Sequence, residues 1–385
     1  MADNKDKKVL NVPALRFPEF SEEWKEERLG KIAELSKGVG ISKEQLSEDG
    51  EPCILYGELY TKYKSEIIHK VISKTNIESS NLKRSKRNDV IIPCSGETAI
   101  DIAVARCVPF DNILLGGDLN IIRLHKDDGA FMAYQLNGKR KIDIAKLAQG
   151  VSVVHLYGEN IKAIKTYNPC LQEQQKIVKL LSMLDERIEV QNKIIEKLET
   201  LIKGIRHKVF KQLRKDFGFN STIGDILSFE QPQRYIVSSA EYSNDDTFIP
   251  VLTANKAFIL GYTTETDGIY DKGDCIIIDD FTLDCKYVSF PFKVKSSAIK
   301  ILTANNKFIL RYTYEYLKSL ELSTEEHKRH YITEIQPYSC VLPDENTLKT
   351  IALVFENLAY KLSNEQSLAL ILNKQRQYLL SKMFI

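Results

Sequence analysis

Aliphatic residues recur at alternating spacings of four and three along the segment that follows Pro169. Nine of the ten positions in this series are aliphatic, and charged residues fill the positions on the outside. A period of 3.5 residues is typical of a coiled-coil seam, so the segment is predicted to form one helix of about 40 residues, roughly 60 Å long. The series consists of Ile177, Leu181, Leu184, Ile188, Gln191, Ile195, Leu198, Ile202, Ile205 and Val209.

The same pattern returns 174 positions later, at the end of the chain. Pro169 then corresponds to Pro343, and the polar residue that interrupts the seam, Gln191, corresponds to Glu365. Ile202 alone meets a polar residue outside this break, Arg376. The C-terminal segment is therefore predicted to be a second copy of the helix. Its seam consists of Ile351, Phe355, Leu358, Leu362, Glu365, Ala369, Leu372, Leu379 and Met383.

The repeat extends into the residues before each helix. At the same offset Tyr157 corresponds to Tyr331 and Ile161 to Ile335. Further upstream, LGKI at 29–32 resembles IGDI at 223–226, and NDVII at 88–92 resembles GDCII at 273–277. The chain is thus predicted to alternate domain, helix, domain, helix, and the first domain is about 20 residues longer between its matched ends. The predicted bounds are 1–168, 169–214, 215–342 and 343–385.

Neither predicted helix can bury its aliphatic stripe alone. Two of them lying antiparallel would bury both stripes, with one domain at each end. Each could instead be a core helix of a bundle, but two equally spaced copies favour a paired spacer. The predicted fold class is α+β, with two mixed α/β domains and two long antiparallel coiled-coil helices in an internal pseudo-two-fold repeat. We hypothesise that Gln191 and Glu365 set the register, so that replacing both with Leu stabilises the pair and loosens its register.

Within the domains, short β-branched and aromatic runs separated by Gly, Asn and Asp predict strands. These runs cover residues 89–93, 120–124, 247–252, 275–279 and 297–302. Helices are predicted for 130–136 and 308–319. The two domains are therefore expected to be mixed α/β.

The composition is that of a globular chain with 385 residues, 43% of them hydrophobic and 28% charged. No apolar run approaches the roughly 18 residues that would span a membrane, and the charged N-terminus lacks the apolar core of a secretory signal. The seven cysteines form no CxxC pair, so we expect a reducing cytoplasm and neither a disulfide framework nor a zinc ribbon. A net charge of +2 leaves the partner open, because the clustering of basic residues matters more.

Motifs for catalysis are missing from the sequence. It contains no GxxxxGK[ST] or GxGxxG loop, no Gly-x-Ser-x-Gly elbow and no metal-ligand spacing among its six histidines. The segment NPCL at 168–171 lacks the second proline of an amino-methyltransferase loop. The acidic pair Asp344 and Glu345 is expected at a helix N-terminus, where it favours the helix dipole. The chain is therefore predicted to be a binding scaffold without catalytic, metal or cofactor sites.

Basic residues cluster in both predicted domains. Lys and Arg neutralise phosphates, while Gln and Arg can also reach base edges in the major groove. Each cluster alone is more typical of a solvated surface, but their presence in both duplicated domains makes DNA binding an equally good interpretation. Two domains that bind DNA predict two half-sites, about one helical turn apart and different in sequence. The candidates are Lys83, Arg84, Lys86, Arg87, Lys139, Arg140 and Lys141, and then Gln231, Gln233, Arg234, Lys328 and Arg329, the last two flanked by His327 and His330.

Several short motifs occur in a characteristic order. PALRFPEF at 13–20 precedes Trp24 and LG at 29–30, EQQKI at 173–177 leads into LDERI at 184–188, and DDFT at 279–282 precedes KYV at 286–288. In these motifs and in the order of its elements, essentially the whole chain resembles the specificity subunits of type I restriction-modification enzymes. The third motif is similar to a common target-recognition variant, which adds Thr282, Lys286 and Tyr287 to the DNA-binding candidates.

The resemblance implies that domains 1–168 and 215–342 are target-recognition domains, each contacting one half of a split, asymmetric site, and that the helices are a conserved spacer. It implies two methyltransferase subunits as partners, which use S-adenosylmethionine to methylate adenine N6 after flipping the base out of the duplex. Two restriction subunits that use ATP with Mg would join for cleavage. This chain would bind no cofactor itself.

The second half departs from the pattern, because TLK stands at 347–349 where the first half has EQQ. Partner docking is therefore expected to be less symmetric than the duplication suggests. Two alternatives stay open. One is a coiled-coil structural or interaction protein without DNA recognition, and the other is a specificity segment separated from a fused methyltransferase-nuclease. The missing cofactor motifs disfavour the second, and a neighbouring methyltransferase reading frame would argue against the first.

Overall fold

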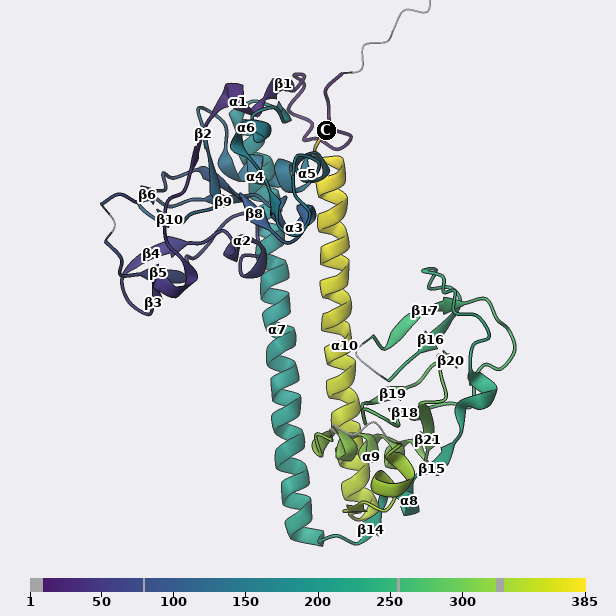
Figure 1. The fold of residues 1–385 in the computed structure, drawn as a ribbon. Coiled ribbons are helices and arrows are strands. Elements are labelled where there is room, and N and C mark those ends of the chain that lie inside the picture. Colours follow the sequence, from purple (N-terminus) through teal and green to yellow (C-terminus); the bar gives the residue numbers. More distant parts are fainter. Residues whose placement is uncertain (1–9, 79, 255–256, 323–328) are drawn as a thin grey trace, which may run out of the picture. The chain divides into compact units, whose positions relative to one another are not determined.

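The computed structural model describes residues 10–78, 80–254, 257–322 and 329–385. The chain divides into two compact units (Figure 1). Unit 1 contains residues 1–191 and 368–385, and unit 2 contains residues 192–367. The candidate Lys328 and its neighbour His327 lie outside the described residues.

Two long helices contribute to both units. Helix α7 (Leu171–Phe217) has 47 residues and helix α10 (Glu345–Lys382) has 38; they are the long teal and yellow helices of Figure 1. In unit 1, Ile177 shares an apolar cluster with Met383, and Asp185 pairs with Arg376. In unit 2, Glu199 accepts a hydrogen bond from Gln366, and the ring of Phe210 lies 6.4 Å from that of Phe355. In each unit, positions ascend along α7 as they descend along α10, so the helices run antiparallel there.

The seam residues lie on the inner sides of these helices. In unit 1 they are buried or half-buried at Ile177, Leu181, Leu184, Ile188, Gln191, Leu372 and Leu379. In unit 2 the same holds for Ile195, Leu198, Ile202, Ile205, Phe355, Leu358, Leu362 and Glu365. The predicted fold class, mixed α/β domains with two long helices, is confirmed.

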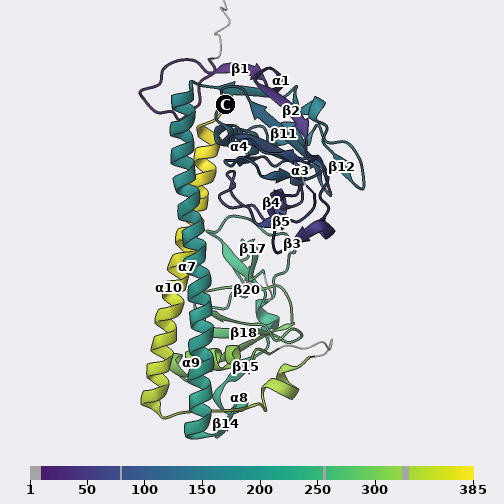
Figure 2. The ribbon, with the colours of Figure 1, turned by 90° about the vertical axis from the view of Figure 1, so that its left-hand side faces the viewer.

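Unit 1 contains two main sheets. The four-stranded antiparallel sheet has the order β2 (Ala33–Lys37), β11 (Leu119–Leu124), β7 (Asp89–Pro93) and β9 (Arg106–Val108). The five-stranded sheet has the order β3 (Leu46–Ser47), β5 (Ser73–Thr75), β4 (Glu51–Ile54), β10 (Leu114–Leu115) and β6 (Lys83–Arg84). Figure 2 labels strands of both sheets, β2 and β11 of the first and β3, β4 and β5 of the second.

The remaining elements of unit 1 are short. Strand β1 (Lys25–Arg28) pairs with β13 (Lys165–Asn168), and β8 (Ser95–Gly96) pairs with β12 (Val154–His155). The helices are α1 (Leu29–Ile32), η1 (Lys43–Gln45), α2 (Glu58–Thr61), α3 (Ala99–Ile102), α4 (Gly129–Asn137), α5 (Lys141–Ala145) and α6 (Gly158–Ile161).

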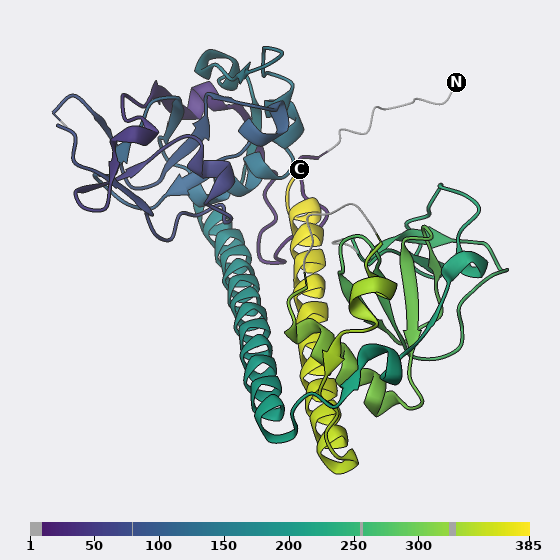
Figure 3. The ribbon, with the colours of Figure 1, turned by 60° about the horizontal axis from the view of Figure 1, so that its bottom comes forward.

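Unit 2 has the same plan with fewer strands (Figure 3). Its four-stranded sheet has the order β15 (Ser228–Glu230), β21 (Ile299–Thr303), β18 (Cys275–Asp279) and β19 (Cys285–Val288). Its three-stranded sheet has the order β17 (Ile259–Thr263), β16 (Ile249–Leu252) and β20 (Lys293–Val294). Strand β14 (Ser221–Thr222) pairs with β22 (Ser339–Cys340), and the helices are α8 (Ile223–Ile226), η2 (Pro232–Tyr235), α9 (Lys307–Ser319) and the π-helical turn η3 (Tyr331–Ile335).

The two units repeat one topology. In each, a central strand that is buried along its whole length, β7 or β18, pairs on both sides within the four-stranded sheet. Helix α4 packs on β7 and β9, as α9 packs on β18 and β19. The second sheet of each unit contains one parallel pair, β4 with β10 and β16 with β20. The duplication inferred from short matches is thus a duplication of whole domains.

Predicted and observed element bounds differ mainly where a polar side chain ends the regular structure. Strand β16 begins at Ile249 and not at residue 247, because Thr247 donates two hydrogen bonds to the Asp245 carboxylate and so belongs to a turn. Helix α4 begins at Gly129, where the Asp128 side chain accepts a hydrogen bond from the backbone of Phe131. No described helix is both long and apolar enough to span a membrane.

Candidate nucleic-acid interface

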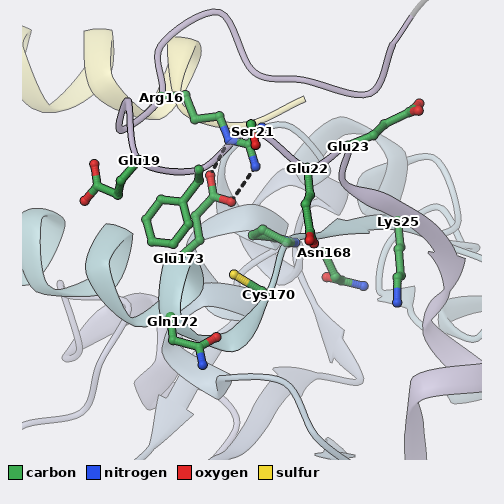
Figure 4. Close-up of a pocket in the computed structure, with 12 residues that line it drawn as sticks. Arg16, Glu19, Ser21, Glu22, Glu23, Lys25, Asn168, Cys170, Gln172 and Glu173 are labelled. Atoms are coloured by element: carbon green, nitrogen blue, oxygen red, sulfur yellow. Dashed lines mark hydrogen bonds and ion pairs between the residues drawn. The ribbon is translucent and has the colours of Figure 1, made fainter.

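The N-terminal arm closes against the first turn of α7, and Figure 4 shows this contact. The Arg16 guanidinium donates two hydrogen bonds of 2.7 Å to the Glu173 carboxylate, which also accepts one of 3.3 Å from the Trp24 indole. Lys176 lies over the ring of Phe17, 4.6 Å from its centroid. The adjoining cavity of about 410 Å³ has both acidic and basic lining residues. Since the central charges are paired with each other, we interpret this region as a structural joint.

The next residue of the same motif also positions an element. Gln174 is buried; its carbonyl oxygen accepts a hydrogen bond from the backbone of Asp128, and its amide donates one to the Asp127 carboxylate. Both contacts fix the start of helix α4. The EQQ motif therefore joins α7 to the first domain.

The first basic cluster consists of Lys83, Arg84, Lys86 and Arg87. Its two arginines form contacts inside unit 1. Arg84 on β6 forms a 2.7 Å ion pair with Glu51 on the same sheet, and this hydrogen-bonded partner raises the pKa of Arg84. Arg87 donates a hydrogen bond to the carbonyl of Pro109, while Lys86 is exposed and Lys83 half-exposed. The two lysines are the members of this cluster best placed to meet a phosphate.

The second basic cluster is Lys139, Arg140 and Lys141, and only the side chain of its middle residue forms several contacts inside unit 1. Arg140 donates hydrogen bonds to the Ile385 carbonyl at 2.6 Å and to Asp143 at 3.1 Å, and its guanidinium lies over the ring of Tyr167. This side chain therefore ties residue 385 to the first domain, while its role in DNA binding stays a prediction. Lys139 is exposed, and Lys141 is half-exposed at the start of α5.

In unit 2, three candidates lie on or beside η2. The Gln231 side chain accepts a 2.8 Å hydrogen bond from the buried Lys300, whereas Gln233 and Arg234 are exposed. Lys286 and Tyr287 are half-buried on β19, and the Tyr287 hydroxyl donates to Asp274 at 2.7 Å. Burial raises the pKa of Tyr287, so the ring stays neutral and bridges strands of unit 2.

The structure brings Arg329 and Thr282 together, although they come from separate motifs. Between them lies the buried Asp280, whose carboxylate accepts backbone hydrogen bonds from His330 at 3.1 Å and Tyr331 at 2.8 Å. The other carboxylate oxygen pairs with Lys300 at 3.2 Å. The exposed Thr282 and Arg329 therefore flank the same buried carboxylate, that of Asp280.

Unit 1 has an equivalent pair of loops that the sequence reasoning did not select. Strand β8, which follows β7, pairs Ser95 with His155 on β12. His155 and Tyr157 are exposed and stack with ring centroids 6.3 Å apart, and Lys37 lies 5.9 Å from the Tyr157 ring centroid. A signal existed, because the offset of 174 that relates Tyr157 to Tyr331 also relates His155 to the candidate Arg329.

The described residues contain no group of three or more His, Cys, Asp or Glu arranged to hold a metal ion. Each unit does have an exposed basic residue beside an exposed aromatic ring on a loop fixed by backbone hydrogen bonds. The pair is His155 with Tyr157 in unit 1 and Arg329 with Phe281 in unit 2. Such groups contact phosphates and base edges.

Comparison with known proteins agrees with this interpretation. The profile of the type I restriction modification DNA specificity domain matches residues 21–200. This segment, less than half of the chain, is similar to that domain. It includes most of the first domain and the start of α7, with the joint between Trp24 and Glu173 inside it.

Two curated relatives share the domain. The specificity subunit of the type I restriction enzyme EcoR124I/EcoR124II of Escherichia coli is 44% identical over 141 residues, which is 35% of this chain and 35% of that protein. The MjaVIII specificity subunit of Methanocaldococcus jannaschii is 27% identical over 208 residues, 54% of this chain and 45% of that protein. The matches therefore span less than half the length of either relative.

A solved structure extends the likeness in fold to the whole chain. The type I restriction-modification S subunit from M. genitalium superposes with a TM-score of 0.70 at 18% identity, covering 97% of this chain and 99% of that one. The specificity domain and the second unit together thus share the fold of an S subunit.

Proposed function

We propose that this chain is the DNA-specificity subunit of a type I restriction-modification system, a non-catalytic protein that recognises a bipartite, asymmetric site. The observation that supports this most directly is the specificity domain at 21–200, followed by a second unit with the same topology. The two units carry different side chains on equivalent loops, such as His155 and Arg329. Two related but unequal readers suit two different half-sites.

The exposed sides of α7 and α10 in unit 1 carry apolar residues that could bind a partner protein. Leu180, Met183 and Val190 on α7 and Ile371 and Tyr378 on α10 are exposed, and each immediately precedes a seam position. In an antiparallel pair, equivalent flanks lie on the same side, so these residues form one apolar face. We assign this face to helices of a methyltransferase subunit, since exposed apolar patches typically mark interfaces.

The proposal divides the chemistry between subunits. This chain binds the duplex and sets the position of its partners on the DNA. Methyltransferase subunits bind S-adenosylmethionine and methylate adenine N6, and restriction subunits use ATP with Mg. We propose two copies of each partner. Because the DNA target is cytoplasmic, the proposal places the chain in the cytoplasm.

The direct test is to co-express the chain with the methyltransferase subunit of its own system and to map N6-methyladenine across the host genome. A split motif with one methylated adenine on each strand is expected. If both proteins are soluble and associated but no new motif arises, the chain is an interaction protein and the proposal fails. A matched pair of variants tests the apolar face: Met183→Glu should abolish association, whereas Glu186→Ala on the exposed side of the same helix should not.

A further inference from the structure

The loop at 150–154 of unit 1 is closed at its base by paired backbone. Gln149 and His155 exchange two hydrogen bonds, of 2.9 and 2.7 Å, and the backbone N–H of Leu156 donates to the Cys94 carbonyl at 2.7 Å. Gly150 has a φ of +123°, and a Cβ there would lie 2.2 Å from the Val153 carbonyl oxygen. The loop is thus a tight, glycine-dependent turn with a defined conformation.

This pinned turn exposes aliphatic side chains. Val151 is 98% exposed and Val153 is 52% exposed, with the exposed Ser152 between them. Holding two valines in water on an ordered turn gives no packing energy to the isolated unit. A partner that covers these side chains would gain that energy on binding, and the methyl group of thymine is the apolar feature that the DNA major groove offers.

The flank of the turn supplies the polar part of a DNA contact. His155 and Tyr157 stack at an interplanar angle of 26°, and the exposed Lys37, at the end of β2, lies beside the Tyr157 ring. A lysine in this position can neutralise a phosphate. This flank therefore adds an exposed cation and two exposed aromatic rings to the exposed valines of the turn.

The equivalent surface in unit 2 has the same backbone topology but different exposed side chains, namely Arg329 and Phe281. Arg329 is half-exposed, and its guanidinium lies 5.9 Å from the centroid of the exposed Phe281 ring. Its distance to the Asp280 carboxylate is 4.0 Å, so that acid is shared with Lys300 and does not hold the guanidinium closely. The Arg329 Nη2 also donates a long hydrogen bond of 3.5 Å to the Ser297 hydroxyl. A planar guanidinium held only by such long contacts is suited to the O6 and N7 acceptors of guanine.

We propose that these two pinned loops are the base-reading elements of the chain. Val151 and Val153 select a T·A pair in one half-site through the thymine methyl group. Arg329 selects a G·C pair in the other half-site by two hydrogen bonds to guanine. This inference rests on the proposed function and adds to it the residues, and the base, that each unit reads.

The test uses the full chain with its methyltransferase subunit and N6-methyladenine mapping as the readout. The double variant Val151→Ser, Val153→Ser should lower the preference for thymine at one motif position about four-fold, from the loss of a methyl contact. Arg329→Ala should lower the preference for guanine at one position by about ten-fold or more. The two changes should fall in different half-sites, and every other position should keep its base.

Two control variants alter residues that are exposed like Val151, Val153 and Arg329 but lie outside the two loops. Ile72→Ser removes an aliphatic side chain of 53% exposure from unit 1, and Lys349→Ala removes an exposed cation that lies over the ring of Phe308 in unit 2. Both should leave the motif unchanged. Thermal unfolding and association with the methyltransferase check that all variants fold.

The outcomes separate the inference from the function beneath it. If the unaltered chain yields a split motif and the folded loop variants keep every base preference, the loops do not read bases and the inference is overturned. The same follows if either loop variant alters both half-sites. If the unaltered chain yields no split motif, the proposed function fails, and the inference fails with it.

Discussion

Arg16 and Glu173 form a two-point ion pair of 2.7 Å across 157 positions of sequence. The hydrogen bonds that Arg16 donates to this carboxylate raise the pKa of Arg16 against the opposing effect of burial. Arg16 lies in the PALRFPEF motif and Glu173 in the EQQKI motif, and the structure shows that the two motifs contact each other. The contact anchors α7 on the first domain, so its loss would loosen the attachment of the helix to that domain.

Glu173→Ala should destabilise unit 1 by about 3 kcal/mol, because it leaves the half-buried Arg16 and the buried Trp24 indole without their acceptor. Trp24 is the single tryptophan of the chain and touches the altered site, so its fluorescence during urea unfolding reports on this unit. The exposed Glu22 serves as control, and Glu22→Ala should shift the midpoint little. Equal midpoints for the two variants would contradict the joint.

Arg376 occupies a seam position where the heptad pattern predicts an aliphatic residue. Its guanidinium pairs with Glu66 and Asp185, and Asp185 also accepts a 2.6 Å hydrogen bond from Tyr134. Burial alone would lower the pKa of Arg376, but the two carboxylates raise it. Arg376→Leu should therefore destabilise unit 1 despite matching the pattern, by about 3 kcal/mol at pH 7.

Urea midpoints at pH 7 measure this loss for Arg376→Leu against the unaltered chain. A variant with the midpoint of the unaltered chain would show that the Glu66 and Asp185 carboxylates do not depend on the guanidinium.

Cysteine labelling should distinguish one thiol from six. Cys170 is exposed, whereas the other six are buried, and burial raises their pKa values to about 11 or 12. At pH 8 an aromatic disulfide reagent should titrate one thiol in the native protein and seven in urea. Cys170→Ser should remove the native reaction. Rapid native labelling of a second thiol would show that the core opens more readily than the structure implies.

Lys83→Ala with Lys86→Ala should weaken DNA binding uniformly across sequences and reduce the salt slope by about 2, since each lost phosphate contact removes close to one unit. Binding of short duplexes at several salt concentrations measures the slope. Arg84→Ala provides the contrast: because Arg84 pairs with Glu51, it should affect the slope less than either lysine. An unchanged slope in the double variant would place these lysines away from the DNA.

The sequence alone determined the long-range plan of the chain. Heptad spacing and a constant offset of 174 residues predict two helices and two domains, because periodic burial along a helix leaves a periodic pattern of apolar residues. The buried strands 89–93 and 275–279 were predicted at their observed bounds, since strands buried along their whole length are continuous apolar runs.

Only the tertiary structure decided which charged residues are available to a ligand. Arg84, Arg140 and Arg376 look alike in sequence as basic residues, but their partners Glu51, Ile385 and Glu66 are distant along the chain. The exposure of Val151 and Val153 was likewise invisible in the sequence, because they resemble core residues until the turn at Gly150 directs them outward. Periodicity records which face of an element is buried, whereas the pairing of a charge and the exposure of a loop depend on contacts that the folded chain alone brings together.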